Sequence, residues 1–261
     1  MRTHRAAAAN DTDDDLVSAL ANGLRSLEAF TPNHRQMTVS DVAKQTGLSR
    51  AAARRYLLTM TACGYTEFDG KRFQLTSRVL RLGHAYISSM QLPQIAQPIV
   101  EELGHKTDES IAFSILEGSE SLTIASSTPR RIVGIFTRVG THLPALSTAT
   151  GRVVLAARSD DEIETRLKSD RIEKLTEKTK TSREEIWAEI ERIRKSGYAI
   201  NDQEIEVGLR VIAVPVRRPG GGVIASLCVS TYSSRYEVEQ LTKKFLRPLL
   251  EASERLGTAL M

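Results

Sequence analysis

Residues 40–65, SDVAKQTGLSRAAARRYLLTMTACGY, decide the fold class of the N-terminal part of this chain. Ser40 is placed to cap a first helix, because its hydroxyl can accept a free N–H of the first turn. Gly47 suits the left-handed residue that ends a helix, and Ser49 is placed to cap a second one. The stretch therefore predicts two short helices joined by a tight turn, a pattern typical of a helix-turn-helix DNA-binding domain.

The second predicted helix has a core face made of Ala53, Leu57 and Met60. Arginine can donate paired hydrogen bonds to guanine or phosphate, and small alanines allow close approach to a groove. The positions outside the core face are therefore our DNA-binding candidates, together with the start of the first helix. They are Ser40, Ser49, Arg50, Ala51, Ala52, Arg54, Arg55 and Thr59. An ordinary helical hairpin with a solvated basic face is the alternative interpretation of this segment taken alone.

The residues on both sides of this pair favour DNA binding. Residues 65–76, YTEFDGKRFQLT, predict a β-hairpin around Asp69-Gly70, with Lys71 and Arg72 at its tip. A basic hairpin that follows a recognition helix is a wing, which can contact the DNA backbone. Upstream, the leucines of residues 16–30 recur at helical spacing and predict a first helix on which the pair packs.

Charge is distributed unevenly along the chain. Residues 16–92 hold ten Lys/Arg and four Asp/Glu, a net charge of plus six. Residues 93–261 hold twenty-four of each sign. Phosphate binding requires a local positive excess, and this excess coincides with the predicted DNA-binding segment.

Composition excludes several other classes of protein. No uninterrupted apolar run reaches about 18 residues, so no membrane span is predicted. Residues 1–15 are polar and acidic at their end, which predicts a disordered tail and no secretory signal. Cys63 and Cys228 fall in different predicted domains, so we expect no disulfide framework and a cytoplasmic protein. No Cys/His cluster has metal-ligand spacing, and neither a metal nor a cofactor is expected.

The remaining chain alternates helices and strands. An amphipathic linker helix is predicted over 78–92, where Pro93 should end or bend it. Further helices are predicted at 94–106, from about Thr148, from Asp160, at 182–196 and at 234–260; strands are predicted at 110–117, 121–127, 131–136, 198–202, 209–217 and 223–231. This order predicts an α+β domain over 93–261, with an antiparallel sheet covered by helices. The DNA-binding domain is assigned to 16–77.

Five ordered blocks resemble the IclR family of bacterial transcriptional regulators over nearly the whole chain. They are TVSDVAKQTGLSRAAARRYLLTMTACGY (38–65), DGKRFQLTSRVLRLGHAYISS (69–89), GTHLPALSTATGRVVLA (140–156), YAINDQEIEVGLRVIAVPV (198–216) and GVIASLCVSTYSSR (222–235). The resemblance implies a winged helix-turn-helix domain, a linker helix and a GAF-like effector-binding domain with an antiparallel sheet. It also implies homodimers formed through the N-terminal domain, often paired into tetramers, on palindromic double-stranded DNA. The last two blocks look most like the branch that regulates protocatechuate and β-ketoadipate catabolism.

The resemblance also implies where a small organic acid effector, aromatic or dicarboxylic, would bind. The matching positions are Thr148, Ala149, Gly151, Arg152, Asp202, Val211, Ser226, Cys228 and Ser230. Backbone N–H groups at the start of the helix near Thr148 could meet a carboxylate, and the last three residues alternate along one face of a strand. Simple sheet packing is the alternative role for that row. Some members of the family have cysteine where Val211 stands. A diacid would need a cation, for which Arg130, Arg131, Arg138 and Arg152 are the candidates.

Two other functions stay open at this point. An enzyme would need a catalytic group, and only Cys228 with Asp202 and His142 offers one, without a surrounding catalytic signature. An interaction module could use the charged helices 182–196 and 234–258. We expect no catalytic residue and favour a DNA-binding regulator controlled by a small acid.

Overall fold

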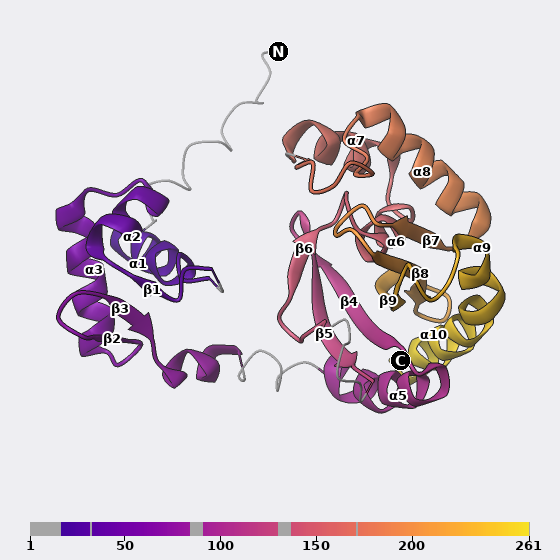
Figure 1. The fold of residues 1–261 in the computed structure, drawn as a ribbon, viewed down its shortest axis with the longest axis horizontal. Helices are drawn as coiled ribbons and strands as arrows, with labels where there is room; N and C mark the ends of the chain where they lie inside the picture. Colours follow the sequence, from indigo (N-terminus) through magenta and orange to yellow (C-terminus); the bar gives the residue numbers. More distant parts are fainter. Residues whose placement is uncertain (1–16, 32, 84–90, 130–136, 171, 261) are drawn as a thin grey trace, which may run out of the picture. The chain divides into compact units, whose positions relative to one another are not determined.

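The computed structural model describes residues 17–31, 33–83, 91–129, 137–170 and 172–260 (Figure 1). The chain divides into two compact units, with the boundary between Tyr86 and Ile87. The expected tail, residues 84–90 of the expected linker helix and the expected strand at 131–136 lie outside the described residues.

The described residues before the hairpin of the N-terminal unit form three α-helices, and the unit also has a small antiparallel sheet. The helices are α1 (Ser18–Glu28), α2 (Val39–Thr46) and α3 (Arg50–Ala62). The strands are β1 (Gln36–Met37), β2 (Thr66–Phe68) and β3 (Phe73–Leu75), in the order β1-β3-β2. Met37, Val42, Ala53, Leu57 and Phe73 form its buried core. The predicted helix pair and hairpin are thus confirmed, and β1 is an additional strand that the sequence did not indicate.

The cap of α2 differs from the prediction. Thr38 is the N-cap: its Oγ1 accepts the N–H of Asp41 at 3.3 Å, and the carboxylate of Asp41 accepts the N–H of Thr38 at 2.8 Å. This reciprocal pair is a capping box, so Ser40 lies inside the helix and the expected Ser40 cap is wrong. Ser49 caps α3 as predicted, and Gly47 has the expected left-handed backbone, with φ of 73°.

The C-terminal unit is built on a six-stranded antiparallel sheet. In spatial order its strands are β6 (His142–Pro144), β5 (Glu120–Ser127), β4 (Ser110–Glu117), β9 (Val223–Tyr232), β8 (Leu209–Arg217) and β7 (Ala199–Asp202). All its neighbouring strands are antiparallel. β6 lies where the sequence predicted a loop. The other five strands match the predicted ones within one residue at either end.

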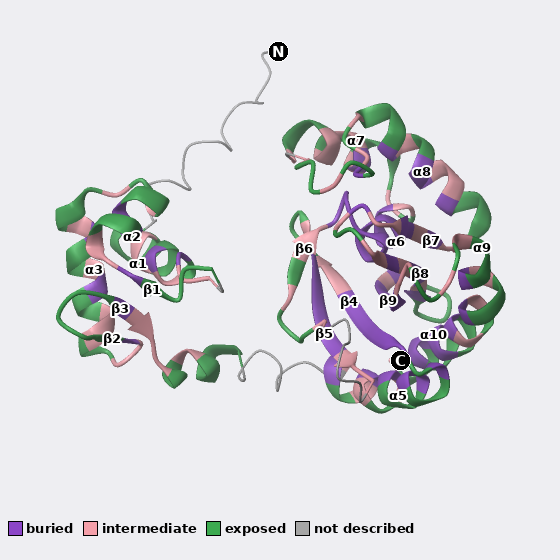
Figure 2. Ribbon diagram, viewed as in Figure 1, coloured by how far each residue is buried: buried purple, intermediate pink, exposed green. Residues whose placement is uncertain are grey.

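Helices cover both faces of this sheet (Figure 1). On one face, α5 (Gln91–Thr107) and α10 (Arg247–Ala259) pack against alternate residues such as Phe113, Leu227 and Val229. On the other face, α6 (Ala149–Leu155) packs against the residues between them, including Ala112 and Cys228. α8 (Arg183–Ser196) and α7 (Asp160–Ser169) lie beyond α6 and share a second cluster with it. Figure 2 shows the central strands buried, as this two-sided cover requires.

Two helix boundaries differ from the prediction for reasons that involve proline. Pro93 lies in the first turn of α5, where a missing N–H costs little, so a helix includes it. The last helix begins with α9 (Val238–Leu241), four residues later than expected, and continues through a π-helical stretch, Thr242–Leu246, into α10. Pro248 follows that stretch and lacks the N–H that would bond the Lys244 carbonyl in an α-helix. None of the described helices has the length and apolarity needed to cross a membrane.

Candidate functional site

A basic, exposed surface covers one side of α3. Arg50, Arg54 and Arg55 are exposed, and none of them forms an ion pair with a described residue. Ala51 is exposed and Ala52 is half-buried beside them, so the side chains next to the guanidinium groups are small. Ser49 and Ser40 are also exposed, at the starts of α3 and α2. Exposed guanidinium groups beside small side chains can approach DNA closely and bind phosphate or base edges.

The hairpin after α3 places two more cations at its tip. The Asp69 carboxylate accepts the backbone N–H groups of Lys71 and Arg72, each at 2.7 Å. These hydrogen bonds hold the pKa of Asp69 below its usual value. They fix the loop, and both basic side chains remain exposed. The tip can therefore contact a polyanion without first being ordered.

An apolar groove lies next to the basic surface of α3. It has a volume of about 570 Å³ and is lined by α1 leucines, Tyr56, Met60 and Leu82, and also by Arg55 and Thr59, two of the DNA-binding candidates. Leu20 and Leu24 are 63% and 50% exposed, although the sequence predicted that they would pack on the helix pair. Ser26 and Ala29 are buried instead. The first helix packs on α3 as predicted, but the expected contact through Leu20 and Leu24 is wrong, because these two leucines face outward.

A small cavity lies between the sheet and the start of α6. Its volume is about 60 Å³. Its lining residues come from every strand of the sheet and from the loops next to them: Ala112, Ser114, Ser121, Thr123, Thr137, Leu143, Thr148, Ala149, Thr150, Asn201, Ile205, Leu209, Val211, Cys228 and Ser230. No charged side chain is among these described lining residues.

Five of the nine predicted effector positions line this cavity. They are Thr148, Ala149, Val211, Cys228 and Ser230. Ser226 faces the same side of β9, but it lies beyond the cavity and its hydroxyl donates to the Ser114 carbonyl at 3.3 Å. Gly151 serves packing, since a Cβ there would lie 2.3 Å from the Cα of Ala145. Its N–H is also committed to the Thr148 hydroxyl, at 3.1 Å.

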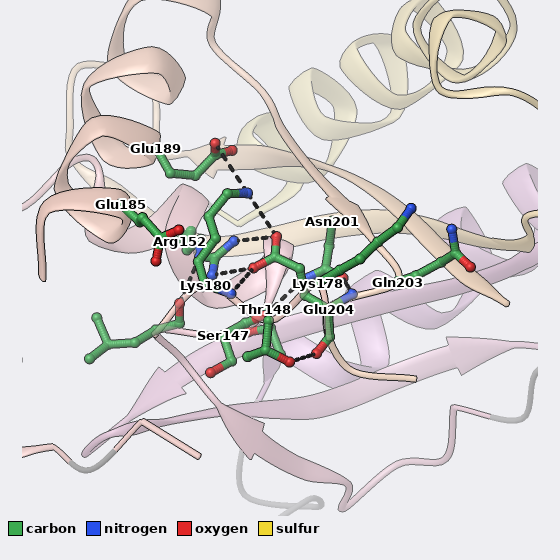
Figure 3. Close-up of polar contacts among 12 residues, drawn as sticks. Ser147, Thr148, Arg152, Lys178, Lys180, Glu185, Glu189, Asn201, Gln203 and Glu204 are labelled. Atoms are coloured by element: carbon green, nitrogen blue, oxygen red, sulfur yellow. Dashed lines mark hydrogen bonds and ion pairs between the residues drawn. The ribbon is translucent and has the colours of Figure 1, made fainter. Parts of the chain in front are cut away.

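Arg152 does not face the cavity, contrary to the prediction. Its guanidinium forms two hydrogen bonds to the Glu204 carboxylate, at 2.7 and 2.8 Å, and both side chains are at least 97% buried (Figure 3). Lys180 lies between Glu204 and Glu189, at 3.0 and 3.6 Å (Figure 3). Burial disfavours ionisation of Glu204, but the guanidinium outweighs it and lowers the pKa of that carboxyl. Arg152 is therefore a structural cation with its partner already in place. Of the other cation candidates, Arg138 is exposed and Arg130 and Arg131 lie outside the described residues.

Asp202 also lies outside the cavity. Its carboxylate accepts from Lys178 at 2.6 Å and from Arg210 at 2.6 Å. Burial opposes ionisation, yet these hydrogen bonds outweigh it and lower the pKa of Asp202 to about 2. Arg210 also donates to the carbonyls of Ser233 and Tyr236, so Asp202 belongs to a polar cluster that fixes the loop after β9.

The sequence did not identify several residues of the cavity wall. Asn201 is buried: its side-chain N–H donates to the Ser147 carbonyl, and its oxygen accepts the N–H of Glu204. Ser114, Ser121, Thr123 and Thr150 are polar residues at buried positions of otherwise apolar segments. Polar residues within otherwise apolar segments were the signal in the sequence that could have identified these wall residues, because a buried hydroxyl group requires a hydrogen-bond partner.

The arrangement does not support a catalytic centre. His142 is on β6 and Asp202 ends β7, which are the two opposite edges of the sheet. Burial raises the pKa of the Cys228 thiol to about 11, so the thiolate nucleophile is scarce at neutral pH. The described residues hold no group of three or more acidic, histidine or cysteine side chains that could bind a metal.

Both units match models of known domains. Residues 19–70 match the IclR helix-turn-helix domain, and residues 84–258 match the C-terminal domain of the bacterial transcriptional regulator IclR.

Individual proteins resemble the chain over most of its length. The Pca regulon regulatory protein of Pseudomonas putida is 38% identical over 94% of this chain and 84% of its own length. The solved structure of a transcriptional regulator from Rhodococcus sp. RHA1 is 40% identical, with a TM-score of 0.80, over 94% of this chain and 98% of that one. An IclR homolog from Microbacterium hydrocarbonoxydans, solved with 4-hydroxybenzoate, is 26% identical, with a TM-score of 0.76, over 93% of this chain and 98% of that one.

Proposed function

Since the chain belongs to the IclR family of bacterial transcriptional regulators, we propose that it binds a palindromic operator as a dimer and that a small carboxylic acid in the C-terminal cavity changes this binding. The observation that carries the proposal is the pairing of an exposed basic helix surface with a hydroxyl-lined cavity in one chain. An effector acts only through its different affinities for the DNA-binding and non-binding arrangements.

DNA recognition rests on α3 and the hairpin tip. Arg50, Arg54 and Arg55 supply the charge along the helix, and Lys71 and Arg72 supply it at the tip. An arginine can bind guanine through two hydrogen bonds, whereas a lysine at the tip contacts phosphate. We therefore assign sequence choice to α3 and general affinity to the tip.

Dimer formation rests on the apolar groove of the N-terminal unit. Leu20, Leu24 and Leu82 are each at least half exposed around it. Contiguous exposed leucines are unfavourable in a monomer, and a second copy of the same surface would cover them. A two-fold dimer also matches a palindromic operator, because each half-site then meets the same α3.

The cavity favours a monocarboxylic acid over a dicarboxylic one. Its described lining residues carry no charge, and the nearby Arg152 is committed to Glu204. One buried carboxylate can be stabilised by neutral donors, but two would lie close together with no cation among the described lining residues, at a high desolvation cost. An aromatic monocarboxylate such as 4-hydroxybenzoate, which the Microbacterium homolog holds, fits this requirement.

The volume of the cavity favours a second candidate. A cavity of about 150 Å³ is known to hold benzene, whereas this one has about 60 Å³. A ring therefore requires its walls to move apart, while a short aliphatic acid such as pyruvate requires less movement. Movement of the walls on binding is also what an effector needs in order to shift an equilibrium.

The test is a mobility-shift titration of the full-length protein on the DNA flanking its gene, at moderate salt. We expect a specific complex whose affinity changes when 4-hydroxybenzoate or pyruvate is added. Absence of any complex with the flanking DNA contradicts the DNA-binding function. A complex that neither these acids nor benzoate alters contradicts the proposed effector class alone.

A further inference from the structure

Four buried hydroxyl groups form one side of the cavity. Ser114 lies on β4, Ser121 and Thr123 lie on β5, and Thr150 lies in the first turn of α6. We call these four residues the hydroxyl quartet. We propose that the hydroxyl quartet binds the carboxylate of the effector. This inference rests on the proposed function, in which a small acid occupies the cavity.

The quartet forms two internal hydrogen bonds. Ser121 Oγ donates to Thr150 Oγ1 at 2.9 Å, and the hydroxyls of Ser114 and Thr123 lie 3.3 Å apart. Each bond uses one hydroxyl hydrogen. Four hydroxyls carry four hydrogens, so one hydrogen of the Ser114–Thr123 pair and that of Thr150 have no acceptor among the described residues.

Two unused donors in this place are costly without a ligand. Ser114 is 2% exposed, Thr123 is 4% exposed and Thr150 is 9% exposed, so bulk water does not reach them freely. A buried donor without a partner is destabilising, because it has lost its hydrogen bond to water and gained none in return. A carboxylate accepts through both oxygens and donates nothing, so it matches a site that has spare hydrogens.

Two of the other polar side chains of the wall are already committed. The Thr148 hydroxyl donates to the Pro144 carbonyl and accepts from Gly151. The Asn201 side chain is held by Ser147 and Glu204. Ser230 has only a weak contact with the Cys228 thiol, at 4.0 Å. The quartet therefore places two spare donors on the β4, β5 and α6 side, away from the row on β9 that the sequence indicated. Thr137 and Ser230 are lining hydroxyls outside the quartet that have no strong partner among the described residues.

The experiment combines a change in the protein with a change in the ligand. Isothermal titration of the full-length protein compares 4-hydroxybenzoate with 4-hydroxybenzamide, which has the same shape but no charge. Thr150→Val keeps the shape of the side chain and removes its donor. We expect it to weaken 4-hydroxybenzoate binding by roughly tenfold or more, because the bond is charge-assisted. The affinity for 4-hydroxybenzamide should fall by several-fold less than the affinity for 4-hydroxybenzoate.

Matched variants separate this effect from a structural one. The double variant Ser114→Ala with Thr123→Val removes the other donor, because either hydroxyl of that pair can supply it, and it should weaken binding of the acid similarly. Thr231→Val is the control, because Thr231 is fully buried on β9, between Ser230 and Tyr232, and its hydroxyl has no partner among the described residues. It should leave acid affinity unchanged. Urea unfolding followed by Trp187 fluorescence checks that each variant is folded.

The outcomes are distinct. Unchanged affinity for 4-hydroxybenzoate in both Thr150→Val and the double variant Ser114→Ala with Thr123→Val overturns the quartet as the carboxylate site, while the proposed function stands. Equal losses for acid and amide also overturn it, because the quartet would then contribute shape and no charge recognition. If the unaltered protein binds none of 4-hydroxybenzoate, benzoate and pyruvate, the effector part of the proposed function fails together with this inference.

Discussion

Arg152 and Glu204 are 52 residues apart in the chain and form a fully buried, two-point ion pair beside the cavity. Arg152 belongs to α6, and Glu204 to the loop after β7 that also carries the lining residue Ile205. The pair therefore joins two segments of the cavity wall.

Removing one partner of this pair should destabilise the C-terminal unit strongly. Glu204→Gln leaves a buried guanidinium unpaired, and we expect a loss of about 3–5 kcal/mol. Arg152→Met should cost a similar amount, and the double variant less than the sum of the two. Trp187 is the only tryptophan and lies in α8, so its fluorescence during urea unfolding reports this unit.

The exposed pair between Glu102 and Arg255 provides the control. It has the same two-point geometry, at 2.7 and 2.8 Å, but its side chains are 58% and 54% exposed. Glu102→Gln should change stability far less, because water screens exposed charges. Equal effects of Glu102→Gln and Glu204→Gln would show that burial does not govern these pairs.

The stability of the C-terminal unit should depend on the ionisation of Asp202. The pKa of this carboxyl is lowered from 3.8 to about 2 in the folded protein. A carboxyl whose pKa is lower in the folded than in the unfolded protein contributes to stability. This contribution is complete at a pH above the unfolded-state pKa and is lost as the pH falls through the folded-state pKa. The destabilisation caused by Asp202→Asn should therefore be constant near pH 7 and shrink between about pH 4 and pH 2.

The measurement is the difference in urea midpoint between the unaltered protein and Asp202→Asn across that pH range. Glu206→Gln is the control, because Glu206 is exposed in the loop that follows Asp202 and has no ion pair with a described residue. If the difference in urea midpoint between the unaltered protein and Asp202→Asn stays constant down to pH 2, the pKa of Asp202 does not govern this stability.

Gly151 should not tolerate even alanine. A Cβ at this position would lie 2.3 Å from both the Cα and the carbonyl oxygen of Ala145. Backbone cannot yield as a flexible side chain can, so Gly151→Ala should cost at least about 1–3 kcal/mol by overpacking. Gly222→Ala is the control, since a Cβ there meets nothing within 4 Å. Equal unfolding midpoints for the two variants would contradict this role for Gly151.

Local signals in the sequence were sufficient for much of the fold. Ser49 and the Ser182–Glu185 capping box mark helix starts, and Gly47 and Gly197 mark ends, because each of these features acts within one turn. The Ser40 cap failed because Thr38 and Asp41 form a stronger local alternative. Edge strand β6 has only three residues, too few for a periodic pattern.

The site was harder to predict than the fold. The alternation along β9 correctly placed Cys228 and Ser230 on one side, but it could not show that the cavity ends before Ser226. The sequence indicated Arg152 as a cation for the effector, but in the structure its ion-pair partner is Glu204, from a distant loop. Such pairings depend on tertiary contacts, and no periodicity in one segment encodes them.

The leucines around the N-terminal groove should hold the dimer together. Leu24→Glu places a carboxylate in a surface that would be buried between two copies, so we expect dissociation into monomers. Sedimentation velocity measures this directly. Leu175→Glu is the control, because Leu175 is 42% exposed but lies in the C-terminal unit. A monomeric unaltered protein, or an unaffected Leu24→Glu dimer, rules out this surface as the interface.

Salt dependence should separate the role of the hairpin tip from that of α3. Lys71 is exposed at the tip, so Lys71→Ala should weaken all DNA sequences alike and reduce the slope of log affinity against log salt by about 1 per protomer. Arg54 faces outward from the first half of α3, and Arg54→Ala should cost about 1–3 kcal/mol per half-site on the operator and much less on unrelated DNA. Lys195→Ala, which removes an exposed charge at the end of α8, should change neither quantity. Fluorescence anisotropy with operator and scrambled duplexes at several salt concentrations measures both effects. If Arg54→Ala weakens the two duplexes equally, α3 contributes charge and not sequence choice.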